Sequence, residues 1–152
     1  MIGNAIVTSG KSIISKIIKK WTHSYWSHCM VMIGEDTFVE ATWPRVRIGR
    51  ISELKDTEYR IMVHVVPLSK IEATNLTAFL LDQVGKKYDW RGLISFIIGS
   101  NVQNKSWFFC SELVKEACEK ANRPLLRRKS SWTTPDDVWS SLMLNETEKG
   151  KK

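Results

Sequence analysis

Two periods of apolar residues alternate along this chain, one typical of strands and one typical of helices. β-rich runs at residues 3–9, 28–33, 37–42 and 60–66 predict strands. Gly34 begins a Gly-Glu-Asp turn between the second and third runs, so these two runs are expected to form a hairpin.

The helical period is clearest in residues 11–21, where isoleucines and a tryptophan share one stripe and the lysines lie opposite. A helix of this kind usually packs on a sheet, and lying on a membrane surface is the alternative. Further helices are expected at residues 69–85, at residues 89–98 after an Asp89 N-cap, from about Ser111, and briefly from Pro135.

Chain length and composition indicate one globular domain. The 152 residues are 43% apolar and 26% charged, which is ordinary for a chain with a hydrophobic core. No internal repeat or long linker interrupts the pattern. We therefore expect a single domain over residues 1–144 and a polar, disordered tail over residues 145–152.

The net charge of +7 favours an anionic partner or surface, although a solvated basic face is the more common meaning of such an excess. No nucleic-acid recognition motif accompanies the charge. The first 25 residues lack the apolar run of a secretory signal, and no apolar stretch could span a bilayer. A cytoplasmic protein is therefore expected, with signal-independent export, as in some phage proteins, left open. The three cysteines form an odd set, which favours reduced thiols over a disulfide framework.

Cys110 is the strongest candidate for a reactive group. It lies where the aromatic run Trp107-Phe108-Phe109 meets the predicted helix from Ser111. Unpaired N–H groups and the helix dipole stabilise negative charge at such a position, so a thiolate and a developing oxyanion would both be favoured there. A lone cysteine at a helix start is nevertheless more often structural than catalytic.

A thiol nucleophile needs a base, and His28 is the best candidate among three histidines. His28 opens a predicted strand, and Glu40 lies on the returning strand. An odd-length turn would put both side chains on one face within reach, whereas an even-length turn would leave Glu40 facing elsewhere. His64 lies inside a β-rich run and is interpreted as structural. Cys29 points away from His28 along the strand and is interpreted as core.

The third cysteine and the residues next to His28 do not favour a different chemistry. Cys118 falls on the apolar stripe of the helix that follows Cys110 and is read as a small buried hydrophobe. A zinc site built from His23, His28 and Cys29 is disfavoured, because adjacent strand residues point to opposite faces. No metal or other cofactor is expected.

Four segments together resemble a known superfamily. Ser27–Gly34, Phe38–Ala41, Lys87–Trp90 and Phe109–Val114 occur in an order similar to the circularly permuted NlpC/P60 superfamily, especially YiiX-like members and their poxvirus relatives. In that branch the histidine hairpin precedes the cysteine helix. The resemblance covers about residues 3–140. One departure is Gly3-Asn4, where the family often has Gly-Asp.

The resemblance implies an α+β, circularly permuted papain-like fold, with an antiparallel sheet packed against helices and the nucleophile at a helix N-terminus. It assigns Cys110 as nucleophile, His28 as base and Glu40 as the orienting residue, and it places Tyr88 near the cleft. Trp26 and Trp43 are further candidates for substrate binding, because large aromatics line clefts.

The predicted function is a cysteine hydrolase of amide bonds, in peptides including those of peptidoglycan, that works through a thioester. A lipid-directed esterase or acyltransferase of the same fold is one alternative, since apolar cleft walls and a basic surface would suit it. A binding or structural module with an inert Cys110 is the other. The expected partner is a peptide-, cell-wall- or lipid-derived substrate.

Overall fold

The computed structural model describes residues 1–89, 109–126 and 133–149. The predicted helix over residues 89–98 falls almost wholly outside these ranges.

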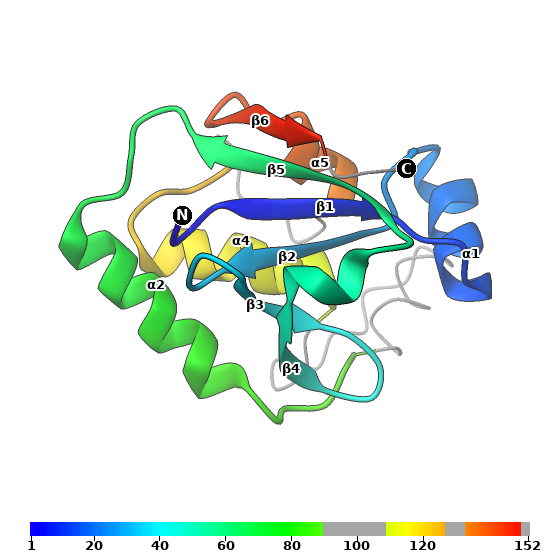
Figure 1. Cartoon of the computed structure of the whole chain (residues 1–152), viewed down its shortest axis with the longest axis horizontal. Helices are drawn as coiled ribbons and strands as arrows, with labels where there is room; N and C mark the ends of the chain where they lie inside the picture. Colours follow the sequence, from blue (N-terminus) through cyan, green and yellow to red (C-terminus); the bar gives the residue numbers. More distant parts are fainter. Residues whose placement is uncertain (90–108, 127–132, 150–152) are drawn as a thin grey trace.

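A six-stranded antiparallel sheet forms the centre of the molecule (Figure 1). Its order is β4-β3-β2-β1-β5-β6, and every neighbouring pair is antiparallel. The strands are β1 (Ala5–Ser9), β2 (His28–Met32), β3 (Thr37–Ala41), β4 (Val46–Arg50), β5 (Glu58–His64) and β6 (Leu144–Lys149). The four strands expected from the sequence are confirmed, and β2 and β3 form the expected hairpin.

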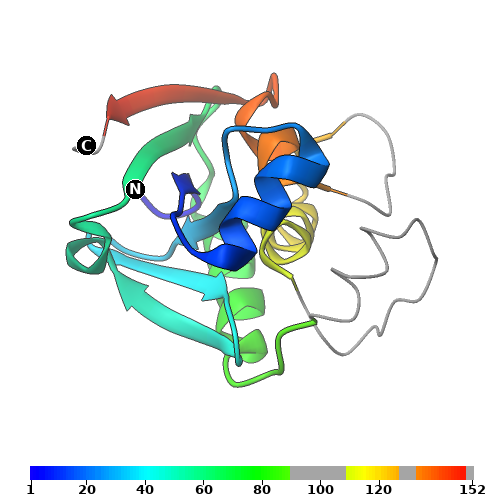
Figure 2. The ribbon, with the colours of Figure 1, turned by 90° about the vertical axis from the view of Figure 1, so that its right-hand side faces the viewer.

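The helices in the described part of the chain lie mostly on one face of the sheet (Figure 2). They are α1 (Ile13–Thr22), α2 (Lys70–Gln83), α4 (Cys110–Lys120) and α5 (Pro135–Trp139). α4 packs on β2 and β3, while α2 packs on α4 and α5 contacts β1. α1 stands apart from them, beyond the end of the sheet where β1 ends and β2 begins (Figure 1).

Alternation along the strands divides the buried side chains into two clusters. The odd-numbered residues of β2, including Cys29 and Val31, face α4 and share the main core with Leu113 and Val114. The even-numbered residues face the other side, where Met30 joins a smaller cluster covered by the short 3-10 helix η1 (Ile51–Leu54). His28 therefore belongs to the same row of β2 as the smaller cluster.

The helix starts follow the sequence closely. The Ser69 hydroxyl accepts the Glu72 N–H, and the Glu72 carboxylate accepts the Ser69 N–H, so α2 begins with a reciprocal cap. Thr134 and Asp137 cap α5 in the same way, with Pro135 as its first residue. The sequence pattern predicted helices that start near residue 69 and at Pro135, but it did not identify these caps.

The disordered tail predicted from residue 145 is wrong for residues 145–149. Leu144–Lys149 form the edge strand β6, which pairs with β5 through a bulge at Ile61 and Met62. A polar edge strand is stabilised by backbone hydrogen bonds to its neighbour, so its own residues carry little apolar pattern. Strand β4 was missed for the same reason, since three of its five residues are exposed.

Helices long and apolar enough to cross a bilayer are absent from the described part of the chain.

Candidate active site

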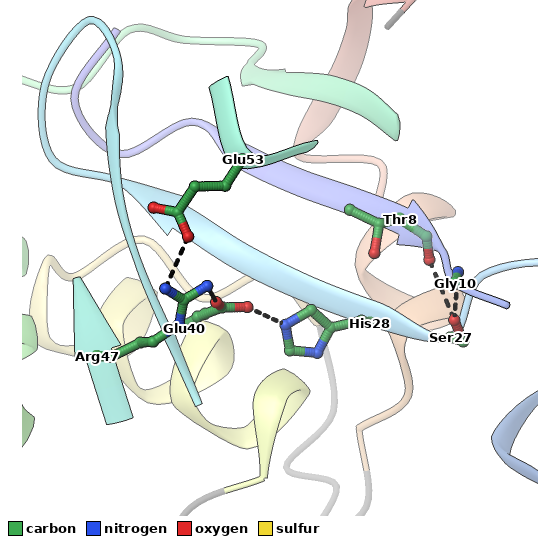
Figure 3. Close-up of polar contacts among 7 residues, drawn as sticks. All are labelled: Thr8, Gly10, Ser27, His28, Glu40, Arg47 and Glu53. Atoms are coloured by element: carbon green, nitrogen blue, oxygen red, sulfur yellow. Dashed lines mark hydrogen bonds and ion pairs between the residues drawn. The ribbon is translucent and has the colours of Figure 1, made fainter. Parts of the chain in front are cut away.

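The hairpin of β2 and β3 brings His28 and Glu40 together. Val31 pairs with Val39 and Met32 with Phe38, so five residues separate the last paired positions and the turn has an odd length. Continuing this register puts His28 and Glu40 on one face in diagonal positions. His28 Nε2 lies 2.5 Å from Glu40 Oε2, and the ring N–H donates to the carboxylate (Figure 3).

Hydrogen bonds at the start of β2 hold His28 in place. His28 lies opposite Thr8 of β1 in the sheet register. The neighbouring Ser27 hydroxyl accepts the Gly10 N–H at 3.0 Å and donates to the Thr8 carbonyl at 3.4 Å (Figure 3). These hydrogen bonds attach the end of β1 to the first residues of β2, so the backbone that carries the His28 imidazole is held in place.

The buried Glu40 carboxylate is held from its other side by Arg47. These residues are directly opposite each other in the β3–β4 register, and Arg47 Nη2 lies 2.6 Å from Glu40 Oε1. Arg47 Nη1 also lies 2.7 Å from Glu53 Oε2 (Figure 3). Although burial acts to raise the pKa of Glu40, the adjacent His28 and Arg47 hold it below its usual value. Glu40 is therefore ionised between two cations.

Cys110 is the first residue of α4 and is almost fully buried. Phe109 precedes the helix in an extended conformation, and no side chain caps it. A hydrogen bond from the Cys29 thiol and the neighbouring His28 imidazolium hold the pKa of Cys110 well below its usual range, although burial acts in the opposite direction. The geometry therefore favours a thiolate at the start of this helix.

The thiol and the imidazole act on each other. Burial acts to lower the pKa of His28, but Cys110 and Glu40 outweigh it and raise this pKa to about 10. Because Glu40 occupies Nε2, the ring nitrogen left for Cys110 is Nδ1. The structure thus brings Cys110, His28 and Glu40 into one cluster, in which a thiolate and an imidazolium coexist over a wide pH range.

Two hollows border this cluster. The larger, about 350 Å³, is lined by His28, Glu40, Trp43 and Tyr88 among others. The smaller, about 20 Å³, is lined by Cys110, Tyr88 and the start of α5. Tyr88 lines both hollows. The largely exposed Trp43 lies at the mouth of the larger hollow.

Trp26 does not line either hollow, so its expected role in substrate binding is not supported. Its side chain is buried in the main core, with its ring centroid 5.1 Å from that of Trp139. Arg60 also lies over the Trp26 ring, 5.6 Å from its centroid. Trp26 lies two residues before β2, and its side chain belongs to the main core.

The remaining thiols and His64 have the structural positions expected of them. Burial raises the pKa of Cys118 to about 12 and also raises that of Cys29. His64 Nε2 lies 3.1 Å from the Gly3 carbonyl, away from the cluster. Cys29 has one feature that the sequence did not indicate: it contacts the Cys110 sulfur. Arg47 was missed as well, because its pairing with Glu40 depends on the register of β4.

Comparison with known proteins finds a similar sequence and a similar solved structure. No family model matches the chain. The "Probable lipoprotein peptidase YaeF" of Escherichia coli K12 is 26% identical over an alignment of 170 residues, which covers 90% of this chain and 61% of YaeF. The chain thus spans less than two thirds of the length of that relative.

The crystal structure of the metalloprotein yiiX from Escherichia coli O157:H7 superposes with a TM-score of 0.79 at 18% identity. The match covers 98% of this chain and 97% of yiiX. Within residues 1–89, 109–126 and 133–149, no three His, Cys, Asp or Glu side chains gather as a metal site would require. The motifs and the superposition agree, and the chain has the YiiX-like form of the permuted NlpC/P60, papain-like fold.

Proposed function

We propose that this protein is a cysteine hydrolase of amide bonds, with Cys110 as nucleophile, His28 as general base and acid, and Glu40 as the orienting residue. One observation carries the proposal: a thiol at the first residue of a helix adjoins an imidazole whose far nitrogen is bound by a buried, ionised carboxylate. This combination supplies an activated nucleophile and a proton carrier in one place.

The reaction follows from the positions of these groups. The Cys110 thiolate attacks the carbonyl carbon, and backbone N–H groups at the start of α4 stabilise the oxyanion. The His28 imidazolium gives its proton to the leaving amine as the C–N bond breaks, which leaves a thioester. The neutral imidazole then takes a proton from water, the hydroxide attacks the thioester, and Cys110 departs as a thiolate.

The similarity to YaeF supports a peptide substrate, and its printed name suggests a lipoprotein as the source of that peptide. An ester or acyl-transfer substrate is the second candidate, because apolar side chains such as Ile14 and Trp43 line the larger hollow. Both candidates pass through the same acyl-cysteine. The mass of the acyl group trapped on Cys110 would distinguish them.

Alkylation of each cysteine against pH tests the proposal directly, with mass spectrometry resolving Cys29, Cys110 and Cys118. At about pH 6 an unperturbed thiol is less than about 1% ionised, so it should react slowly. We expect Cys110 to react at least about tenfold faster than an ordinary thiol at this pH, and His28→Ala to abolish the difference.

Cys118 provides the internal control, because it is equally buried but lacks the imidazole. If Cys110 reacted no faster than Cys118 at any pH below 8, or reacted equally in His28→Ala, the thiol would be inert. The non-catalytic binding module would then be the better interpretation.

A further inference from the structure

Helix α1 is oriented with its apolar stripe toward solvent. Ile13 is 77% exposed and Trp21 is 55% exposed, and Ile14 and Ile17 between them are also exposed. Only Ile18, at one border of the stripe, is buried. An amphipathic helix in a globular protein normally faces its apolar stripe to the core, so α1 is reversed.

Polar and small residues hold α1 in this orientation. The Lys19 amine donates to the Ser9 hydroxyl at 2.5 Å, across from the exposed stripe. Ser15 packs so closely on Gly10 that a Cβ at position 10 would collide with its hydroxyl. The helix is thereby attached to the end of β1 through its polar side, and its apolar side is exposed in the described part of the chain.

The charged side chains of α1 itself are all positive. Residues 1–34 include no Asp or Glu and contain four lysines, Lys11, Lys16, Lys19 and Lys20. Three of these are exposed along the helix or just before it, while Lys19 is partly covered. Apolar side chains flanked by lysines fit a surface that offers both hydrocarbon and negative charge. A second copy of this chain would instead bring lysines against lysines, which disfavours self-association through this face.

The uncovered stripe lies at the mouth of the candidate active site. Ile14 and Ser15 of α1 line the larger hollow together with His28, and Trp43 lines the same hollow from the β3–β4 connection. Ile18 and Thr22 line the smaller hollow beside Cys110. Trp43 is 71% exposed, so it extends the apolar surface across the cleft from α1.

We propose that α1 and Trp43 dock this protein on an anionic phospholipid bilayer, with the mouth of the cleft against the lipid surface. The exposed isoleucines and Trp21 enter the headgroup region, and the lysines contact anionic headgroups. On the basis of the proposed function, the substrate is then the amide of a membrane-anchored molecule, which reaches Cys110 from the bilayer surface.

Cosedimentation with vesicles tests the docking. The protein is mixed with vesicles of phosphatidylcholine alone or of equal parts phosphatidylcholine and phosphatidylglycerol. We expect binding to the anionic vesicles and at least about tenfold weaker binding to the neutral ones, because each lysine near the surface contributes to the attraction. The triple variant Ile13→Ser, Ile17→Ser, Trp21→Ser should lose about tenfold or more in affinity for the anionic vesicles.

Ile71→Ser is the matched control, because Ile71 is 74% exposed on α2 and lies away from the cleft. Lys16→Glu with Lys20→Glu should weaken binding, whereas Lys70→Glu should not, because Lys70 is exposed at the start of α2 and lines neither hollow. Circular dichroism and thermal unfolding of each variant check that it is folded. Equal binding to both vesicle types, no binding at all, or unchanged binding by the triple variant would overturn the proposal.

Docking and catalysis are separated by two further measurements. Cys110→Ala should bind anionic vesicles as the unaltered protein does, whether or not the enzyme proposal holds. The triple variant should keep its rate on a soluble amide and lose rate on the same amide attached to a lipid in vesicles, because none of its three residues lines either hollow. Equal loss on both substrates would contradict a role in docking.

Discussion

Glu40 is the residue on which the proposed chemistry depends most directly after Cys110. Its carboxylate is buried and accepts hydrogen bonds from His28 on one oxygen and Arg47 on the other. A carboxylate shared in this way is ionised, and it both selects the orientation of the imidazole and favours its protonated form. The Glu40 carboxylate also pairs with Arg47, so its negative charge stabilises both the imidazolium and the guanidinium.

Glu40→Gln should lower kcat/KM by roughly 10- to 1,000-fold and change the pH profile. Glu40 helps to raise the pKa of His28 to about 10, so removing its charge lowers that pKa. The imidazolium that protonates the leaving group is then lost at a lower pH. The alkaline limb of the pH profile, expected near pH 10, should therefore move to lower pH in steady-state measurements.

Glu53→Gln is the control for this experiment, because Glu53 contacts Arg47 but not His28. Its profile should stay close to that of the unaltered protein. An unchanged alkaline limb in Glu40→Gln would show that Glu40 does not support the imidazolium.

At the scale of elements, β3 and β4 position the carboxylate and its arginine. Phe38 is fully buried in β3, and its partner in β4 is Gly49. A Cβ at Gly49 would lie 2.5 Å from Cε2 of the Phe38 ring. The glycine is therefore required by the close approach of the ring across the pair, and Glu40 lies two residues after that ring.

Gly49→Ala should lower the free energy of unfolding by about 1–3 kcal/mol, because the Phe38 ring must leave its position or β4 must move away. Urea denaturation of the variant measures this loss. Gly34→Ala is the matched control, since a Cβ there would lie 3.7 Å from the nearest atom, in the Thr37 side chain. If both variants had the same stability, the close contact at Gly49 would not constrain the hairpin.

At the scale of the whole molecule, α4 connects the nucleophile to the rest of the core. It packs on β2 and β3, contacts α2 and α5, and contributes Leu113 and Val114 to the main core. Cys110 stands at the end of this helix, so its position relative to His28 depends on the packing of α4 against the sheet. The packing of α4 on β2 and β3 therefore affects both the stability of the protein and the position of Cys110 relative to His28.

Leu113→Ala should lower the free energy of unfolding by about 2–5 kcal/mol, because it leaves a cavity where α4 meets the sheet. Chemical denaturation measures this, and alkylation of Cys110 at low pH shows whether the thiol keeps its contact with His28. Leu142→Ala should change stability little, since Leu142 is largely exposed. Similar losses from both substitutions would mean that the α4 interface does not dominate the core.

The sequence by itself determined most elements and the candidate chemistry. Strand and helix periods, helix starts near residue 69 and at Pro135, and the position of Cys110 before a helix are local properties of neighbouring residues. Once a turn of odd length is assumed, residue numbering is enough to put the side chains of His28 and Glu40 on the same face of the hairpin. The resemblance to the permuted superfamily then supplied the fold.

Only the tertiary structure decided which surfaces meet. Strand β6 is ordered by its pairing with β5, the register of β4 brings Arg47 to Glu40, and Trp26 turns into the core rather than the cleft. The stripe of α1 was readable in the sequence, but its outward direction depends on contacts of Ser15 and Lys19 with the end of β1. The apolar period of a sequence shows that a helix has a polar face and an apolar face. Residues distant along the chain decide which of these faces is covered, because they pack on the helix only in the folded protein.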